Sequence, residues 1–261
     1  MKKFKKLTSA LVVMTVLGAC LPVSAAVQPN MAKVEERKAR KTQIVGERVG
    51  KVLVSAFELY NEEKLDEAIA LLLDAKSSNE FDTATLNRFL GNLYATKDEK
   101  QAIKYLTLAV KPDVLTFADQ SSSMKLLADM LLQDKQYQTA IKAYEDWMMF
   151  TGEQSSDAYM RIANAYFLLE QHAKVLAPAD DAIRFAAKPV EGPYQLKMAA
   201  LYETRRYKEL VAVVETMVQL FPENKQFWVY LGNFYTLTEE FGKSLTTLQL
   251  AYSQGYLEKD S

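Results

Sequence analysis

Three asparagines recur at matching positions of a repeating pattern, and arginines precede two of them by three or four residues. The row reads Asn92, Asp129, Asn164, Ala199 and Asn233, and the arginines are Arg88 and Arg161. An asparagine side chain donates and accepts hydrogen bonds at once, so it can bind the backbone of an extended peptide, and an arginine adds charged donors. The chemistry that this row predicts is recognition of a protein segment.

Large aromatic side chains and further charged groups fall on the same predicted surface. Exposed aromatics on a concave face exceed what packing requires and are typical of binding anchors. The complete set of predicted groove residues is Phe57, Tyr60, Arg88, Phe89, Asn92, Lys125, Asp129, Arg161, Asn164, Phe167, Tyr202, Tyr230 and Asn233.

The residues needed for catalysis or metal binding are missing from the sequence. His172 is the only histidine and Cys20 the only cysteine, so a zinc site lacks ligands. The nine glycines form no phosphate-binding loop, and no serine lies in a nucleophile elbow. We predict no enzyme activity, no metal and no cofactor. The formal charge of −1 also argues against a nucleic-acid partner.

A small or medium residue recurs at Ala56, Gly91, Ala128, Ala163, Met198 and Gly232, in steps of 35, 37, 35, 35 and 34 residues. The last copy lies in Trp228-Val229-Tyr230-Leu231-Gly232-Asn233-Phe234-Tyr235, whose Trp, Leu-Gly and Tyr have the spacing that opens a tetratricopeptide (TPR) repeat. The period and this segment resemble the TPR family.

The resemblance implies an all-α fold, a right-handed superhelical solenoid of about six TPR helix-turn-helix repeats. A short helix cannot bury its apolar stripe alone, so each hairpin stacks on the next. We expect the solenoid to span 49–258, followed by a tail at 259–261, with repeats at about 49–82, 84–116, 121–154, 156–189, 191–224 and 225–258.

The first 25 residues have the pattern of a secretory signal peptide. Four lysines precede an apolar run from Ala10 to Leu21, and the small residues Val23 and Ala25 favour cleavage after Ala25. This predicts a periplasmic protein. The alternative uses Val16-Leu17-Gly18-Ala19-Cys20, which resembles a lipoprotein signal and would make Cys20 the lipidated first residue of a protein anchored in the outer membrane, facing the periplasm.

Residues 26–48 form a basic segment that we interpret as a tether or as a helix leading into the solenoid. Between residues 33 and 51 there are seven lysines and arginines against three glutamates. A solvated helix accounts for such a run, and contact with anionic lipid or an acidic partner is the alternative.

The C-terminal end carries no obvious cap. A TPR array needs a terminal hairpin with a polar outer face, or something that covers it. The last hairpin could be polar enough, or a partner or second copy could cover it. Our expectation is instead that the sequence is a fragment of a longer protein, because Gln254 to Glu258 reads like a turn into another helix.

Arg88 and Asn92 also resemble the TPR proteins that clamp a peptide's terminal carboxylate. Leu126 stands where that class has its second asparagine, and Asp157 where it has a lysine. We therefore favour groove binding of a peptide over capture of a C-terminus.

Two segments resemble a narrower family. The run Glu35-Glu36-Arg37-Lys38-Ala39-Arg40-Lys41-Thr42 and the segment Ala251-Tyr252-Ser253-Gln254-Gly255-Tyr256-Leu257, with a divergent first hairpin, are similar to exported bacterial TPR proteins of the TonB energy-transduction system. The resemblance implies a periplasmic accessory of the proton-driven motor that energises outer-membrane uptake of iron complexes. The alternative is a TPR lipoprotein that assists pilus, secretion or envelope assembly. The partner and the oligomeric state stay open.

Overall fold

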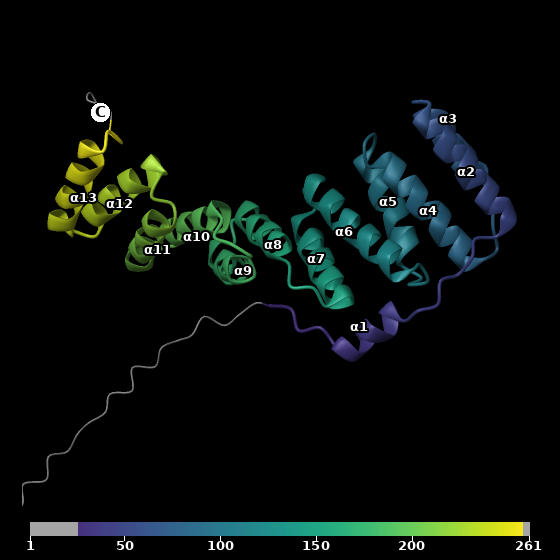
Figure 1. The fold of residues 1–261 in the computed structure, drawn as a ribbon, viewed down its shortest axis with the longest axis horizontal. Coiled ribbons are helices and arrows are strands. Elements are labelled where there is room, and N and C mark those ends of the chain that lie inside the picture. The colour runs from purple at the N-terminus through teal and green to yellow at the C-terminus, as the bar shows by residue number, and fades with distance from the viewer. Residues whose placement is uncertain (1–25, 258–261) are drawn as a thin grey trace, which may run out of the picture.

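The computed structural model describes residues 26–257, and every regular element in this range is a helix. After a short first helix, twelve helices form six hairpins that follow one another along the molecule (Figure 1). The all-α solenoid is confirmed. The helices are α1 (Met31–Lys38), α2 (Glu47–Asn61), α3 (Leu65–Asp74), α4 (Glu80–Tyr94), α5 (Glu99–Val110), α6 (Phe117–Gln133), α7 (Tyr137–Thr151), α8 (Ser156–Leu168), α9 (His172–Arg184), α10 (Glu191–Glu203), α11 (Tyr207–Leu220), α12 (Lys225–Leu237) and α13 (Phe241–Ser253).

We number the hairpins as repeats 1 to 6, from α2–α3 to α12–α13. Several repeats begin with a polar cap: the side chains of Asn79, Thr116, Ser155 and Asn224 each accept a hydrogen bond from a backbone N–H in the first turn of the following helix. The cap at Asn79 explains why α4 begins at Glu80, inside the range expected for the first repeat. The signal peptide and Cys20 lie outside the described residues.

The turn within a hairpin has a common geometry in five repeats. The middle residue of the three that join the helices has a positive φ, between 55° and 63°, and it is never glycine: Glu63, Lys135, Glu170, Arg205 and Glu239. In repeat 3 the N–H of Lys135 donates to the carbonyl of Leu132, and the N–H of Gln136 donates to that of Leu131. These two bonds form a Schellman motif, which satisfies carbonyls at the end of the first helix.

The two helices of a hairpin approach most closely at the small residues of the repeat. A Cβ atom added to Gly91 would lie 2.6 Å from the Cγ of Leu106 on the second helix, and Gly232 faces Leu248 in the same way. Ala128 and Ala163, at the same position, are fully buried. Small residues therefore recur every 34 to 37 positions because a larger side chain there would collide with the second helix of the hairpin.

The apolar core runs through the stack of hairpins. One group of buried side chains joins α2, α3 and α4, a second is centred on Tyr144, Trp147 and Tyr159 between α6, α7, α8 and α9, and a third joins α10, α11 and α12 around Phe227. Each repeat thus packs on its neighbours, as the stacking model requires.

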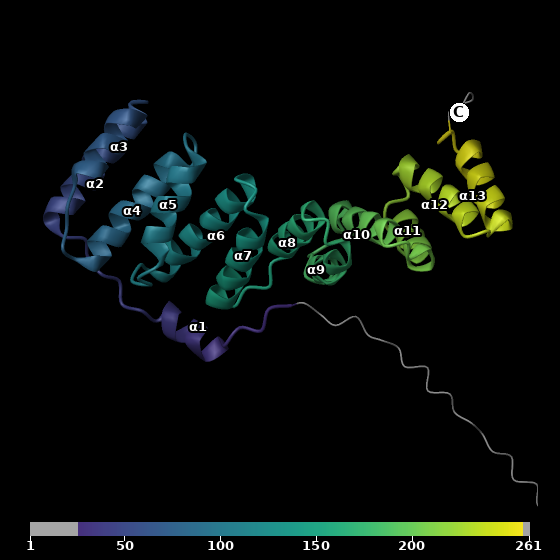
Figure 2. The same ribbon diagram turned by 180° about the vertical axis from the view of Figure 1, so that it is seen from behind.

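The segment before α2 runs back along the solenoid, opposite to the order of the repeats (Figures 1 and 2). We call residues 26–46 the strap. At its start the N–H of Val27 donates to the hydroxyl of Tyr159 in repeat 4, at 2.8 Å. At its end the N–H of Gly46 donates to the Asp82 carboxylate in repeat 2, at 2.9 Å. In between, α1 lies against repeat 3, where Val34 is fully buried.

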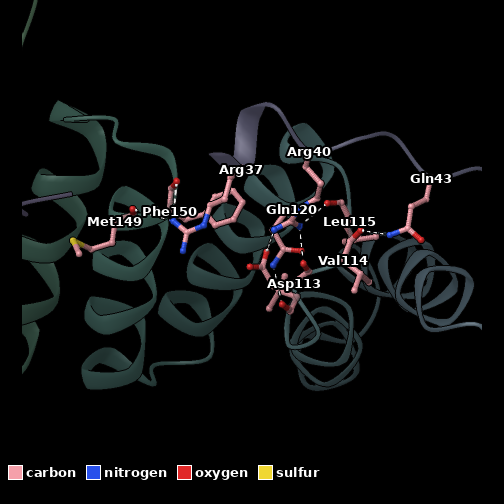
Figure 3. Close-up of polar contacts among 10 residues, drawn as sticks. Arg37, Arg40, Gln43, Asp113, Val114, Leu115, Gln120, Met149 and Phe150 are labelled. Carbon is pink, nitrogen blue, oxygen red and sulfur yellow. Dashed lines mark hydrogen bonds and ion pairs between the residues drawn. The ribbon is translucent and has the colours of Figure 1, made fainter. Parts of the chain in front are cut away.

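Two arginines of the strap bind backbone carbonyls, one at the end of α7 and the other in the loop between α5 and α6 (Figure 3). Arg37 donates to the carbonyl of Phe150 at 3.4 Å, and its guanidinium lies over the Phe150 ring. Arg40 donates to the carbonyls of Asp113 and Leu115 at 2.6 and 3.0 Å and pairs with the Asp113 carboxylate at 3.1 Å. Arg37 and Arg40 therefore hold the strap to the solenoid.

Replacing Lys135 by glycine should raise the free energy of unfolding by about 0.5–1 kcal/mol. A left-handed residue other than glycine costs about 1–2 kcal/mol, part of which the entropy of glycine in the unfolded chain offsets. Chemical denaturation of the variant tests this. The matched control is Gln133→Gly in the last turn of α6, which should lose about 1 kcal/mol. Loss of stability in both variants would contradict the role assigned to the turn.

Replacing Arg40 by alanine should loosen the strap without unfolding the repeats. The change removes three contacts with the loop between α5 and α6, and charged hydrogen bonds of this kind contribute about 1.5–3 kcal/mol each when shielded from water, less here because the site is partly open. Hydrogen exchange of residues 39–46 and 111–116 should accelerate. Lys41→Ala, on an exposed side chain of the same segment, should leave it unchanged, and equal exchange in both variants would rule out the anchoring role.

Candidate protein-binding groove

Ion pairs join the first helices of successive repeats across one face of the solenoid. Arg88 on α4 pairs with Asp119 on α6 at 3.1 Å. Arg161 on α8 pairs with Asp129 on α6 at 3.5 Å, and Lys125 on α6 lies 3.7 Å from Asp157 on α8. Side chains that bridge neighbouring first helices must lie on the surface that those helices share. We call this surface the groove face.

Repeats 1 and 2 form an apolar pocket of about 190 Å³ at one end of the groove face. Four of the predicted groove residues line it together, namely Phe57 and Tyr60 from α2 and Phe89 and Asn92 from α4. Phe57 and Tyr60 are 56% and 47% exposed, although both are large aromatic residues. The guanidinium of Arg88 lies over the Phe89 ring, 4.8 Å from its centroid. The pocket therefore offers aromatic walls with an exposed amide at the rim.

The middle of the groove face, in repeats 3 and 4, is a balanced charge network. The Arg161 Nε donates to Asp157 at 3.0 Å, while its Nη1 lies 3.5 Å from Asp129. The hydroxyl of Tyr144, a buried residue of α7, donates to Asp129 from below. Burial first, and then the bond to Asp129, raises the pKa of the Tyr144 phenol. The phenol therefore stays protonated and remains a donor that fixes the Asp129 carboxylate.

Lys125 completes this network through an aromatic ring. Its ammonium lies 5.0 Å from the centroid of the Trp147 ring, and the indole N–H of Trp147 donates to the hydroxyl of Ser121 at 3.0 Å. The sequence pattern indicated Lys125, Asp129 and Arg161 but not Tyr144 or Trp147. Both of these residues belong to the second helix of repeat 3. There, an aromatic residue at helical spacing predicts a buried core position and gives no sign of a contact with the groove face.

Repeats 5 and 6 carry an aromatic group on the groove face. Tyr202 on α10 lies 6.1 Å from Phe234 on α12, and Tyr230 stacks on Phe234 at the same distance between ring centroids. In repeat 4 Phe167 instead packs on the ring of His172, at 4.9 Å. Asn92 and Asn233 are exposed and Asn164 is half-buried. The predicted residues thus include a set that lines one pocket in repeats 1 and 2, a charged set in repeats 3 and 4 and an aromatic set in repeats 5 and 6.

The pairing of the central cations explains the departures from the carboxylate-clamp pattern. Asp157, which stands where that class has a lysine, contacts Arg161 and Lys125. Both cations therefore have carboxylate partners within the chain, and the centre of the groove is close to neutral.

The structure contains a second apolar pocket that no pattern in the sequence predicts. It measures about 220 Å³, lies between repeats 3 and 4, and is lined by Tyr159, Ile162, Tyr166 and Pro178, with Val27 of the strap at its edge. Burial raises the pKa of Glu145, which also lines it. No signal in the sequence could have located this pocket, because a residue 118 positions before Glu145 closes it.

Residues 26–257 contain neither a metal-binding cluster nor a helix that could span a membrane. No group of three or more His, Cys, Asp or Glu side chains there is arranged to hold a metal ion. None of the helices in the same range combines the length and apolar character required to cross a membrane.

Comparison with known proteins supports the fold. No protein-family model matches the chain, and no curated protein matches its sequence. Among solved structures, MamA has a TM-score of 0.54 at 16% identity, with 66% of this chain and 91% of MamA covered. A TPR protein from Parabacteroides merdae has a TM-score of 0.54 at 12% identity, with 80% of each chain covered. YrrB, described as a TPR protein with an unusual peptide-binding site, has a TM-score of 0.51 at 17% identity, over 65% of this chain and 85% of YrrB.

The repeating hairpins and these structural neighbours define the class. The protein is an all-α solenoid with the TPR fold.

Replacing Tyr144 by phenylalanine should lower the free energy of unfolding by about 1–2 kcal/mol. The change removes a hydrogen bond to a carboxylate, and water replaces it only in part because Asp129 is half-buried. Tyr166→Phe, on a half-buried ring of α8, should change the stability by less than about 0.5 kcal/mol. Chemical denaturation compares the two variants, and equal losses would show that the Tyr144 hydroxyl does not support the network.

Proposed function

We propose that this chain is an exported scaffold that binds a segment of another protein along its groove face, in the periplasm, as an accessory of a TonB-dependent transport system. The observation that carries the binding role is the pocket of Phe57, Tyr60, Phe89 and Asn92. A folded protein rarely leaves two neighbouring aromatic rings about half exposed around a cavity unless something fills it.

The pocket has the size and lining for one apolar side chain of a partner. Buried aromatic anchors contribute most of the energy in such contacts. Asn92, at the rim, can donate to and accept from the backbone of the bound segment and so set its direction. A partner segment with one large apolar residue and an accessible backbone fits this arrangement.

The remainder of the groove face contributes more to the orientation of a bound segment than to its affinity. The central ion pairs are partly exposed, and pairs of this kind contribute little on their own. A bound segment that carries both charges can exchange partners with Arg161 and Asp129, whereas a strongly basic or acidic segment meets a like charge. The aromatic group of Tyr202, Tyr230 and Phe234 provides a second anchoring region for a long segment.

The assignment to TonB-dependent transport rests on the resemblance of residues 35–42 and 251–257 to exported TPR proteins of that system. The export assignment rests on the signal-peptide pattern of the first 25 residues. A preformed scaffold of stacked repeats agrees with an accessory role beside a membrane motor.

The second candidate is an outer-membrane TPR lipoprotein that assists pilus, secretion or envelope assembly. The observation in its favour is the segment from Val16 to Cys20. The mass of the purified protein's N-terminal peptide separates the two, since one form begins at Ala26 and the other at a lipidated Cys20.

The double variant Phe57→Ala, Tyr60→Ala should lose its partner while keeping its fold. We expect affinity purification from crosslinked native envelopes to recover TonB-motor proteins with the unchanged chain, and at least tenfold less with the variant. Tenfold corresponds to about 1.4 kcal/mol, less than two anchor residues normally contribute. Quantitative mass spectrometry provides the measurement, and circular dichroism confirms the helix content.

Val54→Ala is the matched control, because Val54 lies on the same helix and is 60% exposed, yet does not line the pocket. Equal recovery from the double variant and this control would reject the pocket as the binding site. Recovery of pilus, secretion or assembly proteins in place of motor proteins would favour the second candidate.

A further inference from the structure

The last helix, α13, has an apolar stripe that no other part of the described chain covers. Phe241, Leu245 and Tyr252 are 63%, 59% and 55% exposed. Their spacing of four and seven residues places them on one side of the helix. The neighbouring side of the helix, about 100° around the axis from the stripe, packs inside repeat 6, where Ser244 and Ala251 are buried.

The equivalent surface of the preceding repeat, on α11, is covered by a neighbouring helix. On α11 the positions that correspond to Leu245 and Tyr252 are Val211 and Val218, 34 residues before each, and both are buried. They belong to the core that α11 forms with α12, whose Phe227 and Leu231 pack there. The stripe of α13 therefore has the form of a stacking surface for another helix, and this surface continues an interface that already exists inside the solenoid.

The other end of the solenoid is built differently. On α4 the residues that pack toward the preceding repeat are Leu86 and Leu90, both buried. The corresponding positions of α2, 35 residues earlier, are Lys51 and Ser55, both exposed. Lys51 forms an ion pair with Glu47 one turn away. Repeat 1 therefore has polar side chains at the positions where the next repeat has stacking leucines, as in the polar face that caps a repeat array.

The surface around Leu245 and Tyr252 is uncharged, and the charges of Lys243 and Glu240 beside Phe241 form an ion pair with each other. No lysine, arginine, aspartate or glutamate occurs from Ser244 to Leu257. A surface without charge cannot select a charged partner, but it can meet a copy of itself without like-charge repulsion. This property distinguishes a second copy of the same surface from the polar end of the solenoid.

We infer that two copies of this chain pair through their C-terminal repeats, with the α13 stripe of one protomer packed against the α13 stripe of its partner about a two-fold axis. Leu245 and Tyr252 occupy the interface, and the polar faces of repeat 1 become the two outer ends. The dimer then presents two groove faces, so a partner protein that is itself multivalent gains avidity.

Sedimentation equilibrium of the purified chain over a range of concentrations tests the pairing. We expect the unchanged chain to sediment as a dimer and Leu245→Glu to sediment as a monomer with unchanged helix content. Val54→Glu is the matched control, because Val54 on α2 has almost the same exposure as Leu245, 60% against 59%. This variant should remain a dimer. Phe241→Lys, on the same stripe, should repeat the effect of Leu245→Glu.

A crosslinking experiment separates symmetric pairing from head-to-tail association. In a chain with Cys20→Ser, a cysteine introduced by Thr246→Cys should be joined between protomers by a short bismaleimide, whereas one introduced by Val54→Cys should not. A monomer at every concentration would overturn the proposal and leave the stripe to a different protein. Dissociation by Val54→Glu but not by Leu245→Glu would overturn it in favour of another interface.

Discussion

A pair of short helices cannot bury its apolar surface alone, and the structure depends on this constraint throughout. A hairpin inside the array has apolar side chains on both of its flanks, and the neighbouring hairpins cover them. The crossing residues that allow the two helices to approach, such as Gly91 and Gly232, are required because a Cβ atom there would collide with a leucine of the second helix. The period of the sequence, the continuous core and the difference between the two ends of the solenoid all follow from it.

The strap adds contacts of a different kind. A solenoid has only contacts between neighbours, so its repeats can separate locally. Residues 26–46 contact repeats 2, 3 and 4 and lead into repeat 1. The contacts are hydrogen bonds to the Tyr159 hydroxyl, to the Asp82 carboxylate and to backbone carbonyls, including those of Phe150 and Asp113. Arg37 and Arg40 are suited to this role because a guanidinium can donate to several acceptors at once. The strap therefore couples repeats that stacking alone connects only in series.

The groove face has its apolar groups and its charged groups in different repeats. Its apolar and aromatic groups lie toward the two ends, in repeats 1 and 2 and in repeats 5 and 6, while the centre holds paired charges. Because Asp129 and Asp157 neutralise Arg161 and Lys125, the centre does not attract one sign of charge over long distances. A bound segment would thus be retained by its apolar side chains and aligned by hydrogen bonds. The similarity to other TPR structures is one of fold, since the sequence identity is 12–17%.

The sequence by itself determined the number of hairpins, the positions of their close contacts and the residues of the first helices that face outward, because these depend on spacing along a single helix. Asn92 and Phe57 could be placed in this way. The ion pairs of Arg161, the hydroxyl of Tyr144 beneath Asp129, and the anchoring of Arg40 at Asp113 depend on segments that are 15 to 73 residues apart. Only the tertiary structure decided these, because helical periodicity fixes the direction of a side chain but not the group that another repeat, or the strap, brings to meet it.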